Sequence, residues 1–598
     1  MPEATTTPSS RSRPRMTRAA VRRAAALAPG VAIVIRGAQR GRRPTAQAVE
    51  VARVRDGVGA GKSVELLLAS GRRARVPREQ WQEVQGDLEA FVREELAPLD
   101  AAAREAVLET LAAATGLDEE ASLELSASIQ AIREVLRERL PRCAVDEAQP
   151  AGLSVEQVLA VDDSSVWVDG WMHDEDGRGA VTLVSPESAR LAVTAVAHRY
   201  ERPDVVQFYA GLGVERTRDH GFTAHLTLPG PSLLSNGWIA ELETADGTQL
   251  ETPCPAVVRD PAAVRATILG QLGAAGPVGG PLAERHGRPA LTRLQERIVA
   301  EAEIESVDDY GEQPRNPAVS IVVPLYKRLD FLEHQLLHFS RDPGFAELEL
   351  VFVLDSTEQA GELAAQARGL FALHGLPFRV VNLASGAGFA GANLRGIEAS
   401  RASRLLLLNS DVIPSRPGWV GEMSEFYDAT QDIGALGPKL LYEDDSLQHA
   451  GLYFHRPAGS EVWHNGHCFK GLHRTLPAAN LVRPVPAVTA ACMMVDRDLY
   501  EEAGGLPLHY TQGDYEDSEL CLRIGELGRR NWYLPSVELY HLEGQSYLPG
   551  VRRVPSEYNR WLHSQLWGER IEELMSGFDP HDPAASPHRP TTERGKSS

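Results

Sequence analysis

Asp411 follows the apolar run Leu405 to Leu408, from which it is separated by two polar residues. Four consecutive leucines favour a strand buried on both faces of a parallel sheet, although periodicity alone also fits a short buried helix. In an open α/β sheet Asp411 would lie at the carboxyl edge, where such folds bind ligands. A carboxylate there can bind a divalent cation, and the cation can bind a diphosphate. An equally good interpretation is an aspartate that caps the turn before Pro414.

Four further side chains could take part in the same chemistry. Asp355 ends the apolar segment 348–354 and could bind a base or a ribose at the same sheet edge. Glu516 and Asp517 open a helical stretch, where carboxylates either move protons or only stabilise the helix dipole. His541 ends another strand-like segment and is a candidate metal ligand, although a lone histidine is more often structural.

The elements that must position these residues alternate between strand and helix from Pro317 onward. The sequence predicts strands at 319–323, 348–354, 378–383 and 405–408, with helices at 331–339, 360–373 and 392–399 between them. This order indicates a parallel sheet with helices on both faces, which is a Rossmann-like α/β fold. We expect the acidic side chains from separate segments to converge at one rim of that sheet.

A glycine-rich turn, Gly386-Ala-Gly388-Phe-Ala-Gly391, offers a competing interpretation. It is a formal G-x-G-x-x-G between a strand and a helix, and Asp411 follows about 20 residues later, as in a dinucleotide-binding fold. Two complete βα units precede the turn, however, whereas this fingerprint normally opens its domain. The interpretation also leaves the polar residues further along the chain unexplained, so we favour the first one.

Eight segments, in the same order, are similar to those of family 2 glycosyltransferases of the GT-A type, which use nucleotide-diphosphate sugars. The segments are Val319-Ser-Ile-Val-Val-Pro324-Leu-Tyr326, Gly388-Phe-Ala-Gly-Ala-Asn393-Leu-Arg395-Gly396, Leu408-Asn-Ser-Asp411, Leu447-Gln-His-Ala-Gly451, Val488-Thr-Ala-Ala-Cys492, Glu502-Ala-Gly-Gly505-Leu, Glu516-Asp517 and Leu539-Tyr-His541. Each is weak alone, but eight in the family's order are specific. The region resembles bacterial rhamnosyltransferases and O-antigen-type glycosyltransferases.

The resemblance implies roles for the residues near the first strands. Pro324, Tyr326 and Asp355 would line the nucleoside of the sugar donor. Asn393 and Arg395 would lie near its ribose and diphosphate.

The resemblance also implies the catalytic residues. Asp411 would be the metal-binding member of the family's D-x-D motif, with Mn²⁺ or Mg²⁺ as cofactor and His541 as a further ligand. Asp517 would be the general base of an inverting transfer, its pKa raised by the neighbouring carboxylates Glu516 and Glu519. Two residues depart from the family pattern: Asn409 replaces the first acid of D-x-D, and Glu519 stands where the family usually has Asp.

The acceptor side is expected in a histidine-rich loop. Five histidines lie between positions 449 and 473, with Trp463 and Cys468 among them, but the spacing fits no recognisable structural zinc site. We expect Trp463 to stack on a sugar ring of the acceptor and Glu516 to contribute on the same side. An ordinary surface loop fits the pattern equally well.

The rest of the chain is expected to form accessory regions. The sequence predicts a basic, disordered leader (1–45), a small β unit plus helices (46–145), an all-β sandwich-like domain (150–260), a linker and helix (261–315), the GT-A domain (316–575) and a disordered tail (576–598). A net charge of -21 argues against nucleic-acid binding. Scattered cysteines fit a reducing cytoplasm, and the basic leader would suit peripheral association with the inner face of the plasma membrane.

These expectations describe an enzyme of cell-surface polysaccharide synthesis. It would move a hexose or deoxyhexose from a nucleotide-diphosphate donor to a hydroxyl of a glycan or lipid-linked glycan. The alternative is a catalytically inactive glycan-binding or scaffold protein, which the departures at Asn409 and Glu519 motivate.

Overall fold

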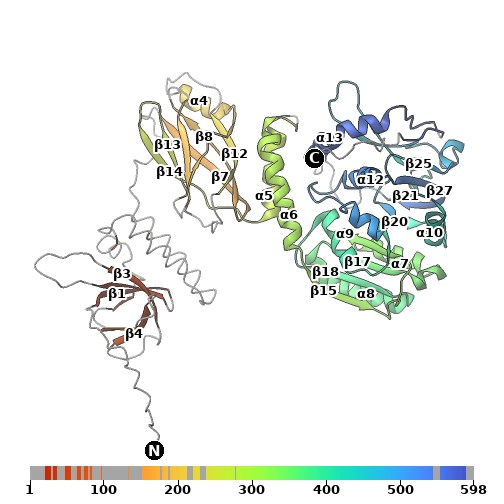
Figure 1. Ribbon diagram of the computed structural model, residues 1–598, viewed down its shortest axis with the longest axis horizontal. Coiled ribbons are helices and arrows are strands. Elements are labelled where there is room, and N and C mark those ends of the chain that lie inside the picture. The colour runs from red at the N-terminus through yellow and green to blue at the C-terminus, as the bar shows by residue number, and fades with distance from the viewer. Residues whose placement is uncertain are drawn as a thin grey trace, which may run out of the picture.

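The computed structural model describes residues 151–174, 178–185, 189–211, 220–228, 237–276, 278–542, 553–582 and 584–587, isolated residues Leu96 and Ile132, and the backbone of six strands between residues 21 and 83. Figure 1 shows a β-sandwich, a pair of helices beside it and a large α/β domain in sequence order. The chain therefore folds around several cores, of which the α/β domain carries the candidate site.

An eleven-stranded mixed sheet forms the centre of the α/β domain. Nine of its strands lie in the spatial order β15 (Ile304–Tyr310), β18 (Phe378–Leu383), β17 (Glu349–Leu354), β16 (Ser320–Leu325), β19 (Arg404–Leu408), β26 (Cys492–Asp496), β21 (Ile433–Leu441), β27 (Arg530–His541) and β20 (Val412–Pro414). The short strands β22 (Leu447–His449) and β25 (Arg483–Val485) pair with β21 and β27. Strands β16 to β19 run parallel, which confirms the predicted α/β fold.

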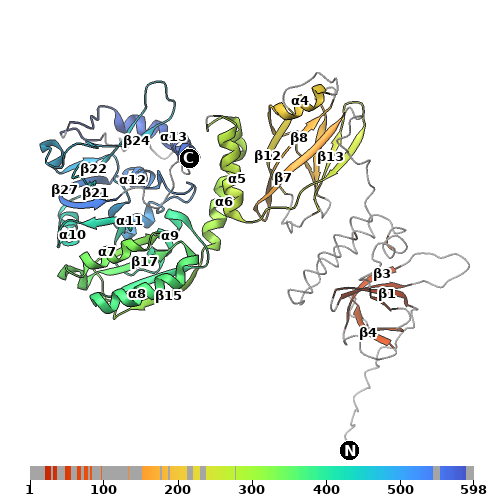
Figure 2. The ribbon, with the colours of Figure 1, turned by 180° about the vertical axis from the view of Figure 1, so that it is seen from behind.

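Helices cover both faces of this sheet because alternate strand residues point to opposite sides. Val322 and Val353 belong to the core under α9 (Gly388–Glu398), whereas Val323 and Phe352 belong to the opposite core. That opposite core includes residues of three helices: α7 (Asp330–Phe339), α8 (Ala360–His374) and α10 (Trp419–Ala429). Figure 2 shows the same layers from behind.

Gly396 allows α9 to lie close to the parallel strands. A Cβ atom at this position would be 2.4 Å from Val322 Cγ1 and 2.7 Å from Val353 Cγ2. We therefore expect Gly396→Ala to lower the free energy of unfolding by about 1–3 kcal/mol through overpacking. Gly361→Ala in α8, where nothing lies within 4 Å, is the matched control and should be neutral or stabilising. Chemical denaturation followed by circular dichroism measures both, and equal effects would contradict the packing account.

The sandwich consists of two four-stranded antiparallel sheets. One contains β7 (Gly152–Asp162), β8 (Ser165–His173), β11 (His198–Tyr200) and β12 (Gly221–Thr227), and the other β9 (Ala180–Val184), β10 (Arg190–Ala192), β13 (Ile239–Glu243) and β14 (Gln249–Pro253). Inward residues such as Val168, Phe222 and Leu242 form its core.

The segment predicted as a linker and helix is a packed part of the structure. Its helices α5 (Pro261–Ala274) and α6 (Arg288–Glu301) share a core with sandwich residues, and the indole of Trp167 donates a hydrogen bond of 2.6 Å to Gln271. Strand β15 then pairs with β18 at the edge of the large sheet. The predicted helix is present as α6, whereas the stretch predicted as linker contains a second helix, α5, that is packed against the sandwich.

Two further boundaries also differ from expectation. A six-stranded sheet begins with β1 (Val21–Ala28) and β2 (Val31–Arg36), so the predicted disordered leader does not hold there; the β-branched run in β2 favours strand over disorder. The helices expected in the 46–145 region lie outside the described residues, apart from the isolated residues Leu96 and Ile132. In the predicted disordered tail, the carbonyls of Pro580 and Asp582 accept hydrogen bonds from Arg483, which fixes residues 580–582 on the α/β domain.

Among the described residues, no helix combines the length and apolar character needed to span a bilayer.

Candidate active site

A cleft of about 440 Å³ opens at the carboxyl edge of the parallel strands. It brings together seven of the side chains that the sequence singles out: Pro324, Tyr326, Asp355, Asp411, Glu516, Asp517 and His541. Strand order explains this convergence, because β16 lies between β17 and β19 and the three strands end side by side. The structure thus places the residues of the expected donor site and the expected base around one space.

Asp355 lies under the start of α9 and is 8% exposed. Its Oδ1 accepts hydrogen bonds from the backbone N–H groups of Ala387, at 2.5 Å, and Gly388, at 3.1 Å. Burial raises the pKa of this carboxyl, and the two hydrogen bonds counteract that rise. The N–H groups of the glycine-rich turn are therefore occupied by a carboxylate, which does not suit the pyrophosphate of a dinucleotide.

Asp411 and His541 form the candidate metal pair. The antiparallel pairing of β20 with β27 places Val412 opposite His541, so the preceding residue, Asp411, comes beside the imidazole. His541 Nε2 is 3.4 Å from Asp411 Oδ1, and the N–H of Leu542 donates to the Asp411 carbonyl at 3.1 Å. A carboxylate and an imidazole at this separation can share one ion, since bonds of about 2.0–2.2 Å to a common metal bring ligand atoms to a similar distance.

This pair fits a divalent ion that takes its other ligands from elsewhere. In the part of the chain that the structure describes, no group of three or more His, Cys, Asp or Glu side chains is arranged to hold a metal. Mg²⁺-type ions commonly use one or two protein ligands and complete their shell with substrate phosphates and water. Asp411 and His541 meet that requirement, whereas the histidine-rich loop offers no zinc site within the described residues.

Asp517 lies at the start of α12 (Glu516–Glu526), with its carboxylate held by two backbone groups. Its Oδ1 accepts from the N–H of Ser518 at 2.7 Å and its Oδ2 from the N–H of Ala490 at 3.1 Å. The carbonyl of the next residue, Ala491, accepts a hydrogen bond from the N–H of Asn409 at 2.9 Å. Residues 490–491 therefore connect Asp517 with the segment that carries Asp411. Burial raises the pKa of Asp517, which suits a residue that must accept a proton.

The neighbours of Asp517 act differently from expectation. Glu516 is 3% exposed, and burial raises the pKa of its carboxyl well above the usual range. Glu519 does not line the cleft. Although burial alone raises the pKa of Glu519, hydrogen bonds from His509 and Tyr510 and the charge of Arg523 lower it to about 2. Glu519 is thus an ion-paired anchor, and burial rather than a flanking Glu519 raises the pKa of Asp517.

A left-handed turn precedes α12 and lines the cleft. Gln512, Gly513, Asp514 and Tyr515 all have positive φ angles, from 59° to 112°, which is costly for residues other than glycine. The side chain of Asn559 holds the turn: its Oδ1 accepts from the Thr511 N–H at 2.9 Å, and its Nδ2 donates to the carbonyls of Thr511, Gly513 and Asp514.

Helix α13 (Arg553–Met575) supplies this support and was not expected to take part. Ser556 and Arg560, one turn apart, line the cleft, and Ser556 Oγ donates to Asp514 Oδ2. Arg560 Nε donates to the Tyr515 hydroxyl at 3.3 Å. No sequence motif marks these residues; only the polar positions four apart on an amphipathic helix could have suggested them.

Three predicted residues lie away from the cleft. Arg395 donates to the carbonyls of Ala302 and Val299, at 2.9 Å each, and so fastens α9 to the end of α6. Asn393 is fully buried and donates to the Phe389 carbonyl within α9. Neither side chain lines the cleft, because Arg395 is bound to the end of α6 and Asn393 bonds within its own helix.

Trp463 does not reach the cleft either. It is 9% exposed, belongs to the main core, and has the Arg456 guanidinium 4.5 Å from its ring centre. Its backbone N–H donates to Ser564 Oγ of α13 at 2.7 Å. Stacking on an acceptor sugar is therefore excluded in this structure. His467 of the same loop does line the cleft, with its Nδ1 at 2.9 Å from the Nδ1 of the buried His449.

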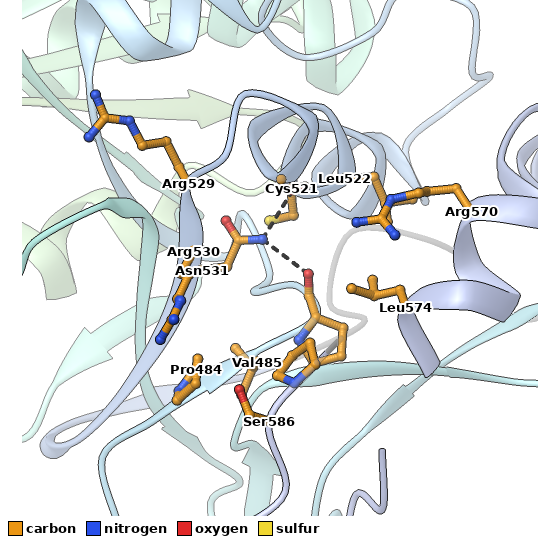
Figure 3. Close-up of a pocket in the computed structure, with 13 residues that line it drawn as sticks. Pro484, Val485, Cys521, Leu522, Arg529, Arg530, Asn531, Arg570, Leu574 and Ser586 are labelled. Atoms are coloured by element: carbon orange, nitrogen blue, oxygen red, sulfur yellow. Dashed lines mark hydrogen bonds between the residues drawn. The ribbon is translucent and has the colours of Figure 1, made fainter. Parts of the chain in front are cut away.

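A second cavity, of about 180 Å³, lies behind α12 (Figure 3). Three arginines line it, Arg529, Arg530 and Arg570, and Arg570 is paired with Glu526 and Glu573. The amide of Asn531 donates to the carbonyls of Pro486 and Cys521. These groups stabilise the fold around α12, and they leave the larger cleft as the candidate site.

Comparison with known proteins supports this assignment. Residues 320–504 match the family model described as glycosyl transferase family 2. The uncharacterized protein y4gI of Sinorhizobium fredii is 28% identical over 279 residues, 46% of this chain and 29% of the relative. The O-antigen biosynthesis protein RfbC of Myxococcus xanthus is 28% identical over 239 residues, 38% of this chain and 18% of the relative. The chain thus spans less than a third of the length of either relative.

Two solved structures share part of the fold at low similarity. A crystal structure of GalNAc-T7 with UDP, GalNAc and Mn²⁺ has a TM-score of 0.34 and 14% identity, covering 44% of this chain and 50% of the other. The mannosyltransferase PcManGT from Pyrobaculum calidifontis with GDP-Man and Mn²⁺ has a TM-score of 0.30 and 14% identity, covering 51% of this chain and 84% of the other. No functional argument rests on likenesses this low. The family match over residues 320–504, the sheet order and the cleft at its carboxyl edge together support a family 2 glycosyltransferase domain of the GT-A type in this α/β part of the chain.

Proposed function

We propose that this protein transfers a sugar from a nucleotide-diphosphate donor to a hydroxyl group of a glycan or lipid-linked glycan, with inversion at the anomeric carbon. The carrying observation is the single cleft in which Asp355, Asp411 and Asp517 meet. Similarity to an O-antigen biosynthesis protein supports a role in cell-surface polysaccharide synthesis. A cytoplasmic location, where nucleotide sugars are made, is part of the same proposal.

The donor occupies the half of the cleft formed by the ends of β16, β17 and β19. Pro324, Tyr326 and Asp355 line the nucleoside there. Asp411 and His541 hold the divalent ion, Mn²⁺ or Mg²⁺, beside the diphosphate. When bound, this ion would neutralise charge that develops on the departing diphosphate.

The acceptor hydroxyl is activated by Asp517. Asp517 takes the hydroxyl proton while the oxygen forms a bond to the anomeric carbon, and the bond from that carbon to the diphosphate oxygen breaks. The nucleoside diphosphate leaves with the bonding electron pair, and attack opposite to it inverts the configuration. The two backbone hydrogen bonds that Asp517 accepts fix its carboxylate for this step.

Donor hydrolysis in the presence of Mn²⁺ tests the proposal without a known acceptor. Wild-type protein should release nucleoside diphosphate from at least one common UDP-, GDP- or dTDP-sugar, because water can replace the acceptor. Absence of turnover with all of them, together with oligosaccharide binding, would instead favour a glycan-binding scaffold.

Removal of the metal pair should abolish the ion-dependent part of nucleotide binding. We expect Asp411→Asn to lose most of the Mn²⁺-dependent rise in melting temperature that the matching nucleoside diphosphate gives to the wild-type protein. Asp428→Asn is the control, because Asp428 lies on α10, is exposed and pairs with Arg404 of β19. An unchanged Mn²⁺-dependent shift in Asp411→Asn would contradict the assignment of the metal site.

A further inference from the structure

Arg560 is a cation in a cleft otherwise rich in carboxylates. Five acidic side chains line the cleft, namely Asp355, Asp411, Asp514, Glu516 and Asp517. Among the described residues of this lining, Arg560 is the one arginine or lysine. It forms no ion pair with any described carboxylate, and its Nε donates to the Tyr515 hydroxyl. A guanidinium that is oriented but not neutralised is suited to bind an anion.

The position of Arg560 separates it from the donor half. Two cations outside the lining act on the donor half: Arg265 on Asp355, and Arg328, which is paired with Asp330, on Asp411. Arg560 acts on Tyr515, which comes two residues before Asp517, and on the imidazoles of His455 and His464.

The two histidines lie within reach of the charge of Arg560, outside the cleft lining. They face each other across β23 (Leu452–His455) and β24 (His464–His467), with ring centres 5.7 Å apart. Tyr453 packs beside His455 with ring centres 5.3 Å apart. All three side chains are half-buried, and Asn465 and His467 of the same hairpin line the cleft.

We propose that the acceptor carries an anionic group, a carboxylate or a phosphate, next to the hydroxyl that is glycosylated, and that Arg560 binds this group. The proposal rests on the proposed transferase function and specifies its acceptor class. Arg560 would hold the acceptor by its charge and orient it toward Asp517, with His455 and His464 as neutral hydrogen-bonding partners.

Binding of three small probes tests the proposal: glucose, glucuronic acid and glucose 1-phosphate. Each is titrated by saturation-transfer NMR into protein that holds Mg²⁺ and whichever of UDP, GDP or dTDP binds. Wild-type protein should bind at least one charged sugar about tenfold or more tightly than glucose. Preference for glucuronic acid identifies a carboxylate as the source of the anion, and preference for glucose 1-phosphate identifies a phosphate.

Variants distinguish a role toward the acceptor from a role toward the donor. Arg560→Gln should abolish the preference for charged sugars and leave the affinity for that nucleotide within about twofold, whereas Arg560→Lys should keep part of the preference and guards against a folding defect. Arg553→Gln is the matched control, because Arg553 lies on the same helix, is exposed and pairs with Glu557. Its binding should equal that of the wild type.

Two results would overturn the proposal. One is an equal affinity of the wild-type protein for charged and neutral sugars. The other is a tenfold loss of nucleotide affinity in Arg560→Gln with the sugar preference retained, which would assign Arg560 to the donor diphosphate. Failure of UDP, GDP and dTDP alike to bind the wild-type protein is a different result, because it would count against the transferase function itself.

Discussion

Asp517→Asn is expected to lower the rate of donor hydrolysis by about 10²- to 10⁴-fold, the usual contribution of a general base. Asparagine keeps the size of the side chain and can still accept the hydrogen bond from the Ala490 N–H, but it cannot take a proton. Binding of the nucleoside diphosphate should persist, since Asp517 acts on the attacking oxygen. Initial rates at saturating donor, combined with a binding titration, measure both quantities.

The control for Asp517→Asn is Asp498→Asn in α11 (Arg497–Glu502), because Asp498 is an exposed aspartate of another helix. Its rate should equal that of the wild type. A rate in Asp517→Asn within about threefold of the wild type would remove Asp517 as the base, and a product that retains the donor's anomeric configuration would do the same.

The raised pKa of Asp517 also predicts the acid side of the pH profile. The proposed mechanism requires the ionised carboxylate of Asp517, so the rate should fall as the pH drops through a value above the ordinary aspartate pKa. The stability of the folded state should change with pH in the opposite direction. A carboxyl whose folded-state pKa is raised disfavours folding at pH values above it, and this cost is relieved as the pH falls. Activity and stability should therefore diverge in this acidic range.

Asn559→Ala is expected to give the second large effect, on both stability and catalysis. The change removes the amide that binds the left-handed turn at Thr511, Gly513 and Asp514, and it leaves these buried backbone groups without their partner. Each buried group left unpaired costs about 1–3 kcal/mol, so we expect a loss of several kcal/mol in unfolding free energy. Without this support the strained turn should relax and displace Asp517, which lowers the rate more than it changes nucleotide affinity.

Hydrogen exchange of residues 511–517 separates this positioning role from general destabilisation. In Asn559→Ala their exchange should accelerate at temperatures where the rest of the domain stays protected. Asn480→Ala is a matched control, because Asn480 also donates to two carbonyls of a turn, those of Arg474 and Leu476, far from the cleft. It should lose stability without losing rate. Unchanged exchange in Asn559→Ala would contradict the proposed support.

The central sheet and the convergence at its edge followed from sequence because both depend on local patterns. Apolar runs such as 405–408 mark buried strands, and parallel strands bring their carboxyl ends to one edge whatever the intervening helices do. Asp355 and Asp411 therefore meet in the cleft as expected. The pairing of β20 with β27 added His541, which was anticipated through family resemblance rather than through any local pattern.

The misplaced residues depend on contacts between distant segments. Arg395 faces α6 and Trp463 faces α13, and periodicity shows that a helix or strand has a buried side without showing what covers it. The left-handed turn escaped prediction because Gly513 alone among its four residues carries the usual signal for positive φ. Asn559 and Arg560 escaped because their partners lie more than 40 residues earlier.

Strand β15 and helices α5 and α6 have a consequence for dissecting this protein. The family match starts at residue 320, yet Ala302 belongs to the core of the matched domain and β15 completes its sheet. A fragment cut at the family boundary would expose the N–H and C=O groups of β18 to any extended peptide, which invites aggregation. Helices α5 and α6 also share a core with Tyr558, Trp561 and Leu562 of α13, so a fragment that keeps the packing of this domain starts no later than Pro261.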